Sequence, residues 1–532
     1  MSIGAASLPS DFGTESSIST FGSLQGRLWL ATAIGLVVVL LAPLFVIDVP
    51  PIEDYPNHLA RFFVLAHPDD AVLSTMYAPH WTILPNLGMD LIGTGLLRIV
   101  GPYTGGKILL ALSLLAPLVG VVIYHRVVFG CLSWWPLASG LTAYNAAFFL
   151  GFMNFLLSLG VAFVGAATWV ALRRQNRLAR MSLAGAVAST LAFFTHIFGL
   201  AFLFVLIGAH EAAALRQRSS STVTLSDVAR ASVPMAVAFA PAVVLYELSP
   251  FSDATNSIGD WEPFAKAVWL FSPFAVMNLN LTIVTAGTFV AALFVMRRRL
   301  EFAPGLWLAL TALAIVYVAT PWNLKGGSFI ELRIAVIFAL LMFSNVRPRI
   351  PRRDAMMLGS AIAILVIVRS AVAGASWIDT RSDLADLRAA IADIEPGARV
   401  MVATGDLNER LFSPPQRVLP GFYRLTNHLP ALLLIERKAF WPLLFASPAQ
   451  QPITILPPFD RIAHPLMDPV KWSKLAAEPY AAETLRRARY LVQWRTNFDY
   501  LLLIDPDSLN RTVAKLTPLH DGAFAKLYRI DR

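Results

Sequence analysis

The sequence is poor in charged residues and has almost no cysteine. Only 14% of its 532 residues are Asp, Glu, Lys or Arg, whereas 56% are hydrophobic. A soluble domain carries about 25% charged residues, so this composition excludes an ordinary soluble protein and indicates that most of the chain lies in lipid. The single cysteine, Cys131, excludes an internal disulfide framework.

Basic residues are scarce in every second loop, and this pattern predicts how the chain is oriented in the membrane. The arginine-rich loops are expected to stay in the cytoplasm, and the loops between them are expected outside. Because the basic residues are spread over short loops, the net charge of +9 does not indicate a nucleic-acid partner. The arginine-rich loops are 125–126, 173–180, 216–218, 297–299 and 347–353.

Long apolar runs predict an α-helical polytopic membrane bundle over 28–375. A polar leader over 1–27 lacks a basic n-region, so we expect a retained first span and a cytoplasmic N-terminus. An odd number of spans then places the rest of the chain in the periplasm. The eleven expected spans lie at about 28–47, 104–124, 132–149, 153–172, 181–195, 197–215, 231–249, 275–296, 304–321, 331–345 and 356–375.

The first external loop, residues 48–103, is large and acidic. We expect a surface helix over 57–67 and another over 85–100, both lying on the membrane. The second segment is apolar enough to span, but counting it as a span would move the arginine-rich loops outside.

Residues 376–532 are expected to form an extracytoplasmic α/β domain. Apolar residues at helical spacing predict a helix over 382–394, and a second helix is expected over about 481–490. We find no zinc spacing, Walker loop or dinucleotide fingerprint here. Strands are predicted at 399–403, 452–456, 500–504 and 524–530.

Glu53 and Asp54 are the first candidates for chemistry, with Asp54 preferred. They follow the first span directly, between the stiffening residues Pro51 and Pro56. A partly desolvated carboxylate there can serve as a base or a metal ligand. The alternative is an ordinary solvated loop acid. The sequence does not decide whether a divalent metal is needed.

Three cations are candidates for binding a phosphate: Arg61, Lys325 and Arg333. Arg61 lies three residues after His58, so the two share a helix face. The alternative for Arg61 is contact with lipid headgroups. Lys325 and Arg333 lie on either side of two glycines, 326–327, which allow close approach of a ligand.

Further candidates for the same pocket are His58, Asp90, Asn154, His196 and Glu331. Each has a structural alternative. Asp90 can cap or solvate an interfacial helix, Asn154 can join helices by hydrogen bonds, and His196 can be a satisfied buried residue. A polar group at membrane depth is nevertheless a site candidate. Glu331 can belong to a local pair, although residues two apart do not face each other on a helix.

The layout of residues 28–375 resembles the polytopic glycosyltransferases of the GT-C fold, which include protein O-mannosyltransferases and lipid A aminoarabinose transferases. In these enzymes an acidic motif follows the first span, as Glu53-Asp54 does here, and surface helices precede the second span, as in 84–127. An extracytoplasmic C-terminal domain is also common among them.

The resemblance implies a donor sugar on a polyprenyl phosphate, whose tail lies in an apolar groove between spans. The acceptor that it implies is a lipid or glycan of the cell envelope, and the location that it implies is the cytoplasmic (inner) membrane of a bacterium. A single displacement with Asp54 as base would invert the anomeric centre. The alternatives are a transporter or lipid flippase, and a non-catalytic envelope scaffold. The lack of an evident repeat and the placing of the acids at one surface favour an enzyme.

Overall fold

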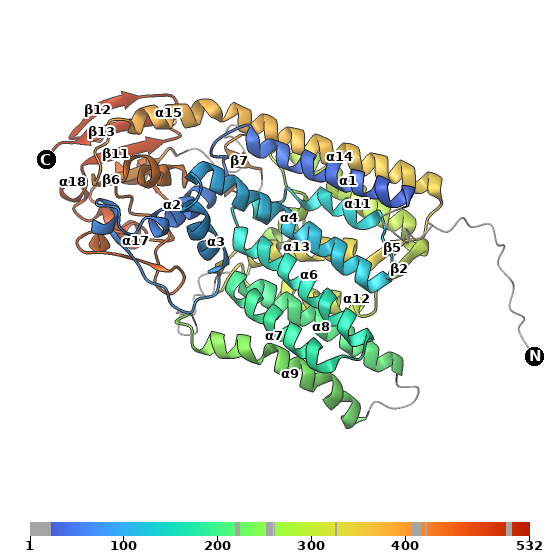
Figure 1. Cartoon of the computed structure of the whole chain (residues 1–532). Helices are drawn as coiled ribbons and strands as arrows, with labels where there is room; N and C mark the ends of the chain where they lie inside the picture. The colour runs from blue at the N-terminus through green and yellow to red at the C-terminus, as the bar shows by residue number, and fades with distance from the viewer. Residues whose placement is uncertain are drawn as a thin grey trace, which may run out of the picture.

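The computed structural model describes residues 23–218, 224–251, 259, 261–324, 327–406, 416–420, 423–506 and 513–532. The chain forms a bundle of long helices with a sheet-containing C-terminal region at one end (Figure 1). We name this the sheet end, and the opposite end, where strands β2 (Leu300–Phe302) and β5 (Val346–Pro348) lie, the arginine end. The expected leader, up to residue 22, falls outside the described residues.

Eight described helices are long and apolar enough to cross a membrane. Large apolar side chains such as Val38, Val187 and Phe294 are more than half exposed on them, as lipid-facing side chains are. The count of eleven spans stays a prediction. The eight are α1 with the 3₁₀ turn η1 (Leu24–Phe45), α4 (Pro102–Phe129), α6 (Met153–Arg174), α7 (Leu178–Thr195), α8 (Ile197–Arg218), α9 (Leu225–Glu247), α11 (Leu279–Met296) and α14 (Arg352–Asp379).

Two shorter helices, α12 (Leu306–Ala319) and α13 (Ile330–Asn345), run within the bundle. Nearly every residue of α13 is buried, and α13 contacts α4 and α12. A helix that is apolar all round belongs in an interior. The structure therefore places α13 at the centre of the bundle, where its first turn reaches the sheet end.

The predicted span over 132–149 is wrong as a regular helix. The segment forms a 3₁₀ helix, η3 (Trp135–Thr142), and one turn of α-helix, α5 (Ala146–Phe149). Pro136 and Gly140 disfavour a long helix, and Asn145 starts α5 by accepting from the Phe148 N–H at 3.0 Å. Residues 138–151 are all buried, which is the condition under which irregular backbone is tolerated at membrane depth.

The first loop contains the two expected helices, α2 (Tyr55–Ala66) and α3 (Gly88–Leu97), and a short strand, β1 (Tyr77–Pro79). β1 pairs antiparallel with β9 (Ile453–Ile455) of the C-terminal region. The buried Asn57 on α2 donates to the Leu443 carbonyl at 3.0 Å and accepts from the Phe445 N–H at 2.8 Å. The first loop and the C-terminal region therefore form one layer over the sheet end.

The C-terminal region is built on a five-stranded sheet of order β10-β6-β11-β13-β12. β6 (Val400–Thr404) pairs parallel with β10 (Val470–Lys471) and β11 (Tyr500–Ile504), and β13 (Ala525–Ile530) is antiparallel to β11 and β12 (Leu516–Asp521). All four predicted strands are present, although β9 pairs with β1 outside this sheet. Helix α15 (Arg381–Ile391) follows α14 and packs on β13.

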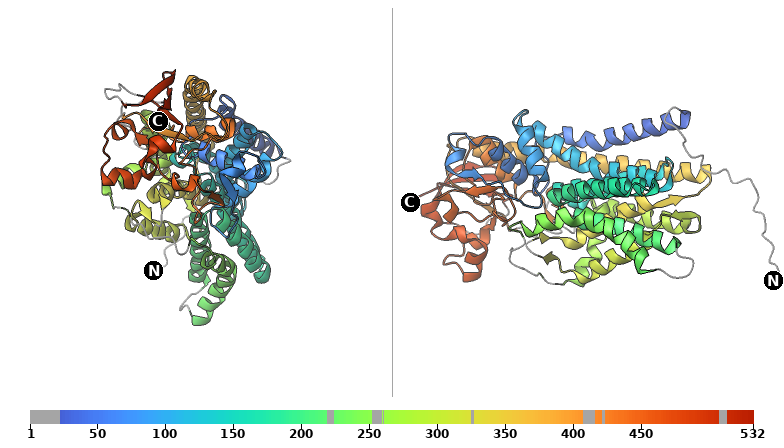
Figure 2. Two further views of the ribbon diagram at one scale, coloured as in Figure 1. Left: turned by 90° about the vertical axis from the view of Figure 1, so that its left-hand side faces the viewer. Right: turned by 60° about the horizontal axis from the view of Figure 1, so that its bottom comes forward.

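Figure 2 shows from two further sides that this region stays at one end of the bundle. Helix α17 (Ala482–Arg487) covers part of the helix expected over 481–490. The remaining short elements are η2 (Leu73–Thr75), α10 (Pro263–Trp269), η4 (Ser272–Phe274), η5 (Arg297–Arg299), β3 (Asn323–Leu324), β4 (Gly327–Ser328), β7 (Val418–Leu419), β8 (Tyr423–Arg424), η6 (Leu429–Ala431), η7 (Leu433–Arg437), η8 (Phe459–Arg461), α16 (Trp472–Leu475), η9 (Arg489–Leu491) and α18 (Trp494–Asn497).

Replacing Asn57 with Ala is expected to loosen the first loop from the C-terminal region. The change leaves the Leu443 carbonyl and the Phe445 N–H without their side-chain partner, at a cost of about 2 kcal/mol or more. The thermal unfolding midpoint of the protein in detergent should fall clearly. Asn497→Ala is the matched control, because Asn497 makes only a local, exposed hydrogen bond to the Val492 carbonyl. Equal midpoints for the two variants would contradict the expectation.

Candidate functional site

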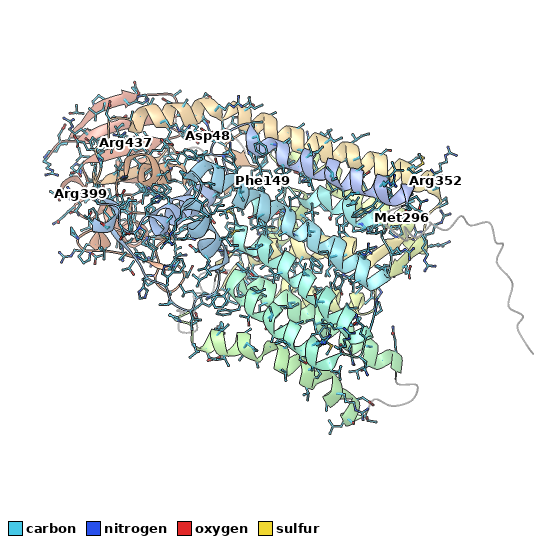
Figure 3. All side chains as sticks on the ribbon, in the orientation of Figure 1. Asp48, Phe149, Met296, Arg352, Arg399 and Arg437 are labelled. Carbon is cyan, nitrogen blue, oxygen red and sulfur yellow. The ribbon has the colours of Figure 1, made fainter. Side chains whose placement is uncertain are left out.

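Glu53 and Asp54, which we call the acidic pair, are bound to the bundle by their backbone N–H groups. The Glu53 N–H donates to the Phe149 carbonyl at 2.9 Å, and the Asp54 N–H donates to the Leu150 carbonyl at 3.3 Å. Figure 3 labels Phe149 near the place where the bundle meets the C-terminal region. Gly151 follows with φ +80°, and a Cβ there would come within 2.9 Å of the Asp54 Cβ and the Tyr55 nitrogen. Only glycine suits this close approach.

The two acids differ in exposure. The side chain of Glu53 is 4% exposed and that of Asp54 is 20% exposed. Neither carboxylate oxygen of Glu53 makes a well-aligned hydrogen bond among the described residues. Burial raises the pKa of Glu53 well above its usual value, and the nearby charges of Asp468 and Asp54 raise it further, although the Asn427 side chain lowers it. Asp54 is therefore the acid that an incoming molecule can reach.

His428 of the C-terminal region completes this cluster. Its Nδ1 lies 3.2 Å from Asp54 Oδ1 and 3.8 Å from Glu53 Oε1. The imidazole is held edge-on by Trp441 and Phe445, with ring centroids 5.9 and 5.0 Å away. His428 was not among the residues predicted from the sequence. Its one distinguishing feature there is its position directly before the apolar run 429–435.

Arg333, at the start of α13, approaches Asp54 from the bundle. The guanidinium lies 4.2 Å from the ring centre of Phe152 and 5.5 Å from that of Phe198, donates to the Ser328 carbonyl and interacts electrostatically with Asp54. The ring of His196 lies 5.6 Å from that of Phe198. Asp54, Arg333 and His196, which are distant in sequence, therefore occupy one neighbourhood.

Arg61 and Asp90 form a buried ion pair, which corrects the expectation that Asp90 caps or solvates an interfacial helix. Arg61 Nε lies 2.6 Å from Asp90 Oδ1, and both side chains are 2% exposed. Arg61 Nη2 also lies 3.0 Å from His58 Nδ1, which confirms that His58 and Arg61 share a helix face. Burial raises the pKa of Asp90 although Arg61 lowers it. Arg61 is thus engaged within the protein and does not meet headgroups.

His58 lies next to the acidic cluster. Its ring centroid is 5.4 Å from that of Phe445, which also contacts His428. Burial lowers the pKa of His58 well below its usual value, and the charges of Arg61 and His428 lower it further. His58 is therefore a neutral neighbour of the site at pH 7.

Asn154 and Glu331 have structural contacts. Asn154 accepts from the Met89 N–H at 2.8 Å and donates to the Asn86 carbonyl at 2.7 Å, which holds α3 against α6. Glu331 pairs with Lys266 at 2.9 Å rather than with Arg333, as expected for residues two apart on a helix. Lys325 lies outside the described residues.

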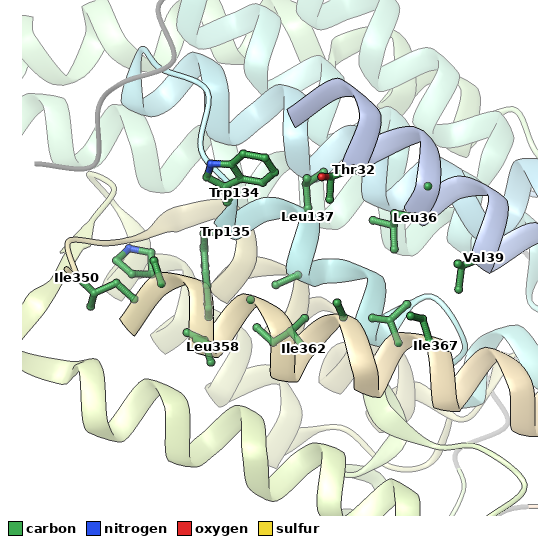
Figure 4. A pocket seen from close by; sticks show the side chains of 17 residues that line it. Thr32, Leu36, Val39, Trp134, Trp135, Leu137, Ile350, Leu358, Ile362 and Ile367 are labelled. Carbon is green, nitrogen blue, oxygen red and sulfur yellow. The ribbon is translucent and has the colours of Figure 1, made fainter. Parts of the chain in front are cut away.

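A large apolar pocket lies away from these residues, in the half of the bundle toward the arginine end (Figure 4). It has a volume of about 410 Å³ and lies between α1, η3 and α14. Apart from Thr32 its labelled lining is apolar or aromatic, including Leu36, Trp134 and Ile362. Such a lining suits a hydrocarbon chain. This pocket lies between spans, as the groove implied by the resemblance does, but Asp54 is not among its lining residues.

Gly151→Ala is expected to disturb the acidic pair. A left-handed backbone costs a non-glycine residue about 1–2 kcal/mol, and the new Cβ would also clash with Asp54 and Tyr55. The thermal midpoint should fall well below that of Gly95→Ala, because the space around Gly95 is open. A midpoint no lower than that of the Gly95→Ala control would show that the turn tolerates a side chain.

No protein-family model matches the chain, and no curated protein matches it. Among solved structures, the chain is similar to the crystal structure of ArnT from Cupriavidus metallidurans in the apo state. The identity is 13%, the match covers 95% of this chain and 97% of that one, and the TM-score is 0.45. ArnT is a lipid A aminoarabinose transferase with the GT-C fold, the class that the sequence resembles. At this identity and TM-score the match carries no argument about this chain, so its chemistry is inferred from its own residues.

Proposed function

We propose that the chain is a membrane glycosyltransferase. It moves a sugar from a polyprenyl-phosphate donor to a lipid or glycan acceptor of the cell envelope, on the outer face of the cytoplasmic membrane. One observation carries the proposal: the partly exposed Asp54 lies beside His428 of the C-terminal region and interacts electrostatically with Arg333 of the bundle. An acid that can take a proton and a cation that can receive a phosphate thus meet where lipid and water meet.

The orientation follows from the arginine residues. Arg174 donates to the Val128 carbonyl at 2.7 Å, and Arg299 pairs with Asp354 at 3.4 Å. The ends of α4, α6 and α11 and the start of α14 therefore lie together at the arginine end, which we assign to the cytoplasm. The sheet end, with residues 376–532, is then periplasmic. Segments 130–149, α12 and α13 supply the three crossings that bring the total to eleven.

In the proposed reaction the acceptor hydroxyl attacks the anomeric carbon of the donor. A new carbon–oxygen bond forms, the bond to the phosphate oxygen breaks with its electron pair going to the phosphate, and Asp54 takes the hydroxyl proton. Arg333 stabilises the charge on the departing phosphate. One displacement inverts the anomeric centre.

The other proposed phosphate ligands contribute less in this arrangement. Arg61 is held by Asp90, with only Nη1 lacking a partner among the described residues. Lys325 stays a proposal from the sequence. Arg333 also has an unpartnered nitrogen, Nε, but it makes no ion pair within the described part of the chain, so it is the cation that we assign to the phosphate.

Asp54→Asn is expected to reduce transfer by about 10²-fold or more, because the amide cannot accept the hydroxyl proton. The measurement is single-turnover transfer from a synthetic polyprenyl-phosphate sugar, with folding checked by gel filtration in detergent. Asp69→Asn is the control, since Asp69 is an exposed acid of the same loop. Near-normal turnover of Asp54→Asn would remove Asp54 from the base role.

Arg333→Gln is expected to lower kcat about 10²–10³-fold, because the cation acts on charge that develops on the leaving phosphate. Arg333→Lys should recover only part of this loss, since it keeps the charge but not the planar contact with Phe152. Arg349→Gln, an exposed arginine at the other end of the bundle, is the control. An Arg333→Gln variant that changes neither kcat nor the KM for the donor would refute the phosphate assignment.

A further inference from the structure

We infer that Glu53, His428 and Asp468 bind a divalent metal ion that fastens the C-terminal region to the first loop. Each residue offers one ligand atom, and the three atoms lie within 4.8 Å of one another. They come from three separate segments: the end of the first span, the loop after β8, and the loop before β10. The ion would have a structural role, because it would cross-link these three segments whichever group the protein transfers.

Two of the three side chains are buried with little of their hydrogen-bonding capacity filled. Glu53 and His428 are each 4% exposed, and neither the Glu53 oxygens nor the His428 ring nitrogens make a well-aligned hydrogen bond among the described residues, although Asn427 acts on Glu53 and His428 Nδ1 lies 3.2 Å from Asp54 Oδ1. Burying polar groups in this way costs free energy. A cation between these two groups removes the cost for both at once.

The charges around the three ligands favour a cation. Asp54 adds a further carboxylate, 3.2 Å from His428 Nδ1. Arg424, the cation that acts on Glu53, has its own counter-charge, because its Nη1 lies 3.2 Å from Asp505 Oδ2. The carboxyl groups of Glu53, Asp54 and Asp468 therefore surround one imidazole, and a cation would relieve the mutual repulsion of these acids.

Neighbouring side chains orient the ligands. The hydroxyl of Tyr423 donates to Asp468 Oδ2, which leaves the other oxygen for an ion. Trp441 and Phe445 hold the His428 ring edge-on. Supporting contacts of this kind are typical of metal sites. Two carboxylates and one imidazole suit Zn²⁺ or Mn²⁺, and ligand distances of about 2.1 Å require the three side chains to draw together slightly.

The experiment uses the full chain in detergent, purified with a tag that contains no histidine and stripped with a chelator. Zn²⁺ and Mn²⁺ are added in separate arms, and bound metal is measured after gel filtration together with the thermal midpoint. We expect about one equivalent of one of the two ions and a higher midpoint with it. His428→Gln and Asp468→Asn should each weaken binding at least about 10-fold.

His464→Gln is the matched control, because His464 belongs to the same region but its Nδ1 accepts from the Arg489 N–H. It should bind metal like the unaltered chain. Asp468 is exposed, so Asp468→Asn gives a readout even if His428→Gln does not fold. The inference is overturned if neither ion binds stoichiometrically, or if Asp468→Asn binds as tightly as the control.

The same preparations separate this inference from the proposed function. Asp54→Asn should still bind metal, because Asp54 is not one of the three ligands. Loss of transfer in Asp54→Asn without any metal binding in the unaltered chain would keep the transferase and remove the metal. Metal binding together with unimpaired transfer in Asp54→Asn would keep the metal site and would remove Asp54 from the proposed reaction.

Discussion

Two main-chain hydrogen bonds set the position of the two acids on which the candidate site depends. They join Glu53 to Phe149 and Asp54 to Leu150, so the start of the first loop is bound to the turn that precedes α6. Side chains can rotate, but this connection is made by the backbone and does not depend on their rotamers. The acids are thus held at the end of the bundle by their own backbone, and Gly151 makes the close approach sterically possible.

The C-terminal region is part of the site and not an appendage to it. It supplies His428, while the pairing of β1 with β9 and the two hydrogen bonds of Asn57 bind it to the first loop. Figure 1 shows this layer closing the sheet end of the bundle. Because the acids, the imidazole and Arg333 come from three parts of the chain, the site exists only when all three parts are folded together.

Local patterns were enough to predict many elements. Helical spacing of apolar residues located α15, the expectation of interfacial helices in the first loop located α2 and α3, and strand-like runs located β6, β9, β11 and β13. Apolar length cannot distinguish a span from a buried irregular segment, which is why 132–149 was predicted as a helix. The segment is as apolar as its neighbours, and its departure from a helix depends on what surrounds it.

Partners distant in sequence were not predictable in the same way. Arg61 and Asp90 are 29 residues apart, and His428 is more distant still from the acids that it faces. A single sequence states which side chains can pair, but the fold decides which of them meet. Lys266 was overlooked for this reason, although it pairs with Glu331 and also donates to two backbone carbonyls.

Arg369 shows how the irregular segment can exist inside an apolar bundle. Backbone carbonyls that lie outside a regular helix lose their partners, and at membrane depth no water replaces them. Arg369 of α14, which is 1% exposed, donates to the carbonyl of Tyr144 in this segment at 2.5 Å and to that of Phe274 at 2.6 Å. The Trp135 indole likewise donates to the Met342 carbonyl at 3.0 Å. The buried arginine and the irregular backbone therefore stabilise each other. The irregular segment leads directly to the turn at Phe149 and Leu150 that binds the two acids.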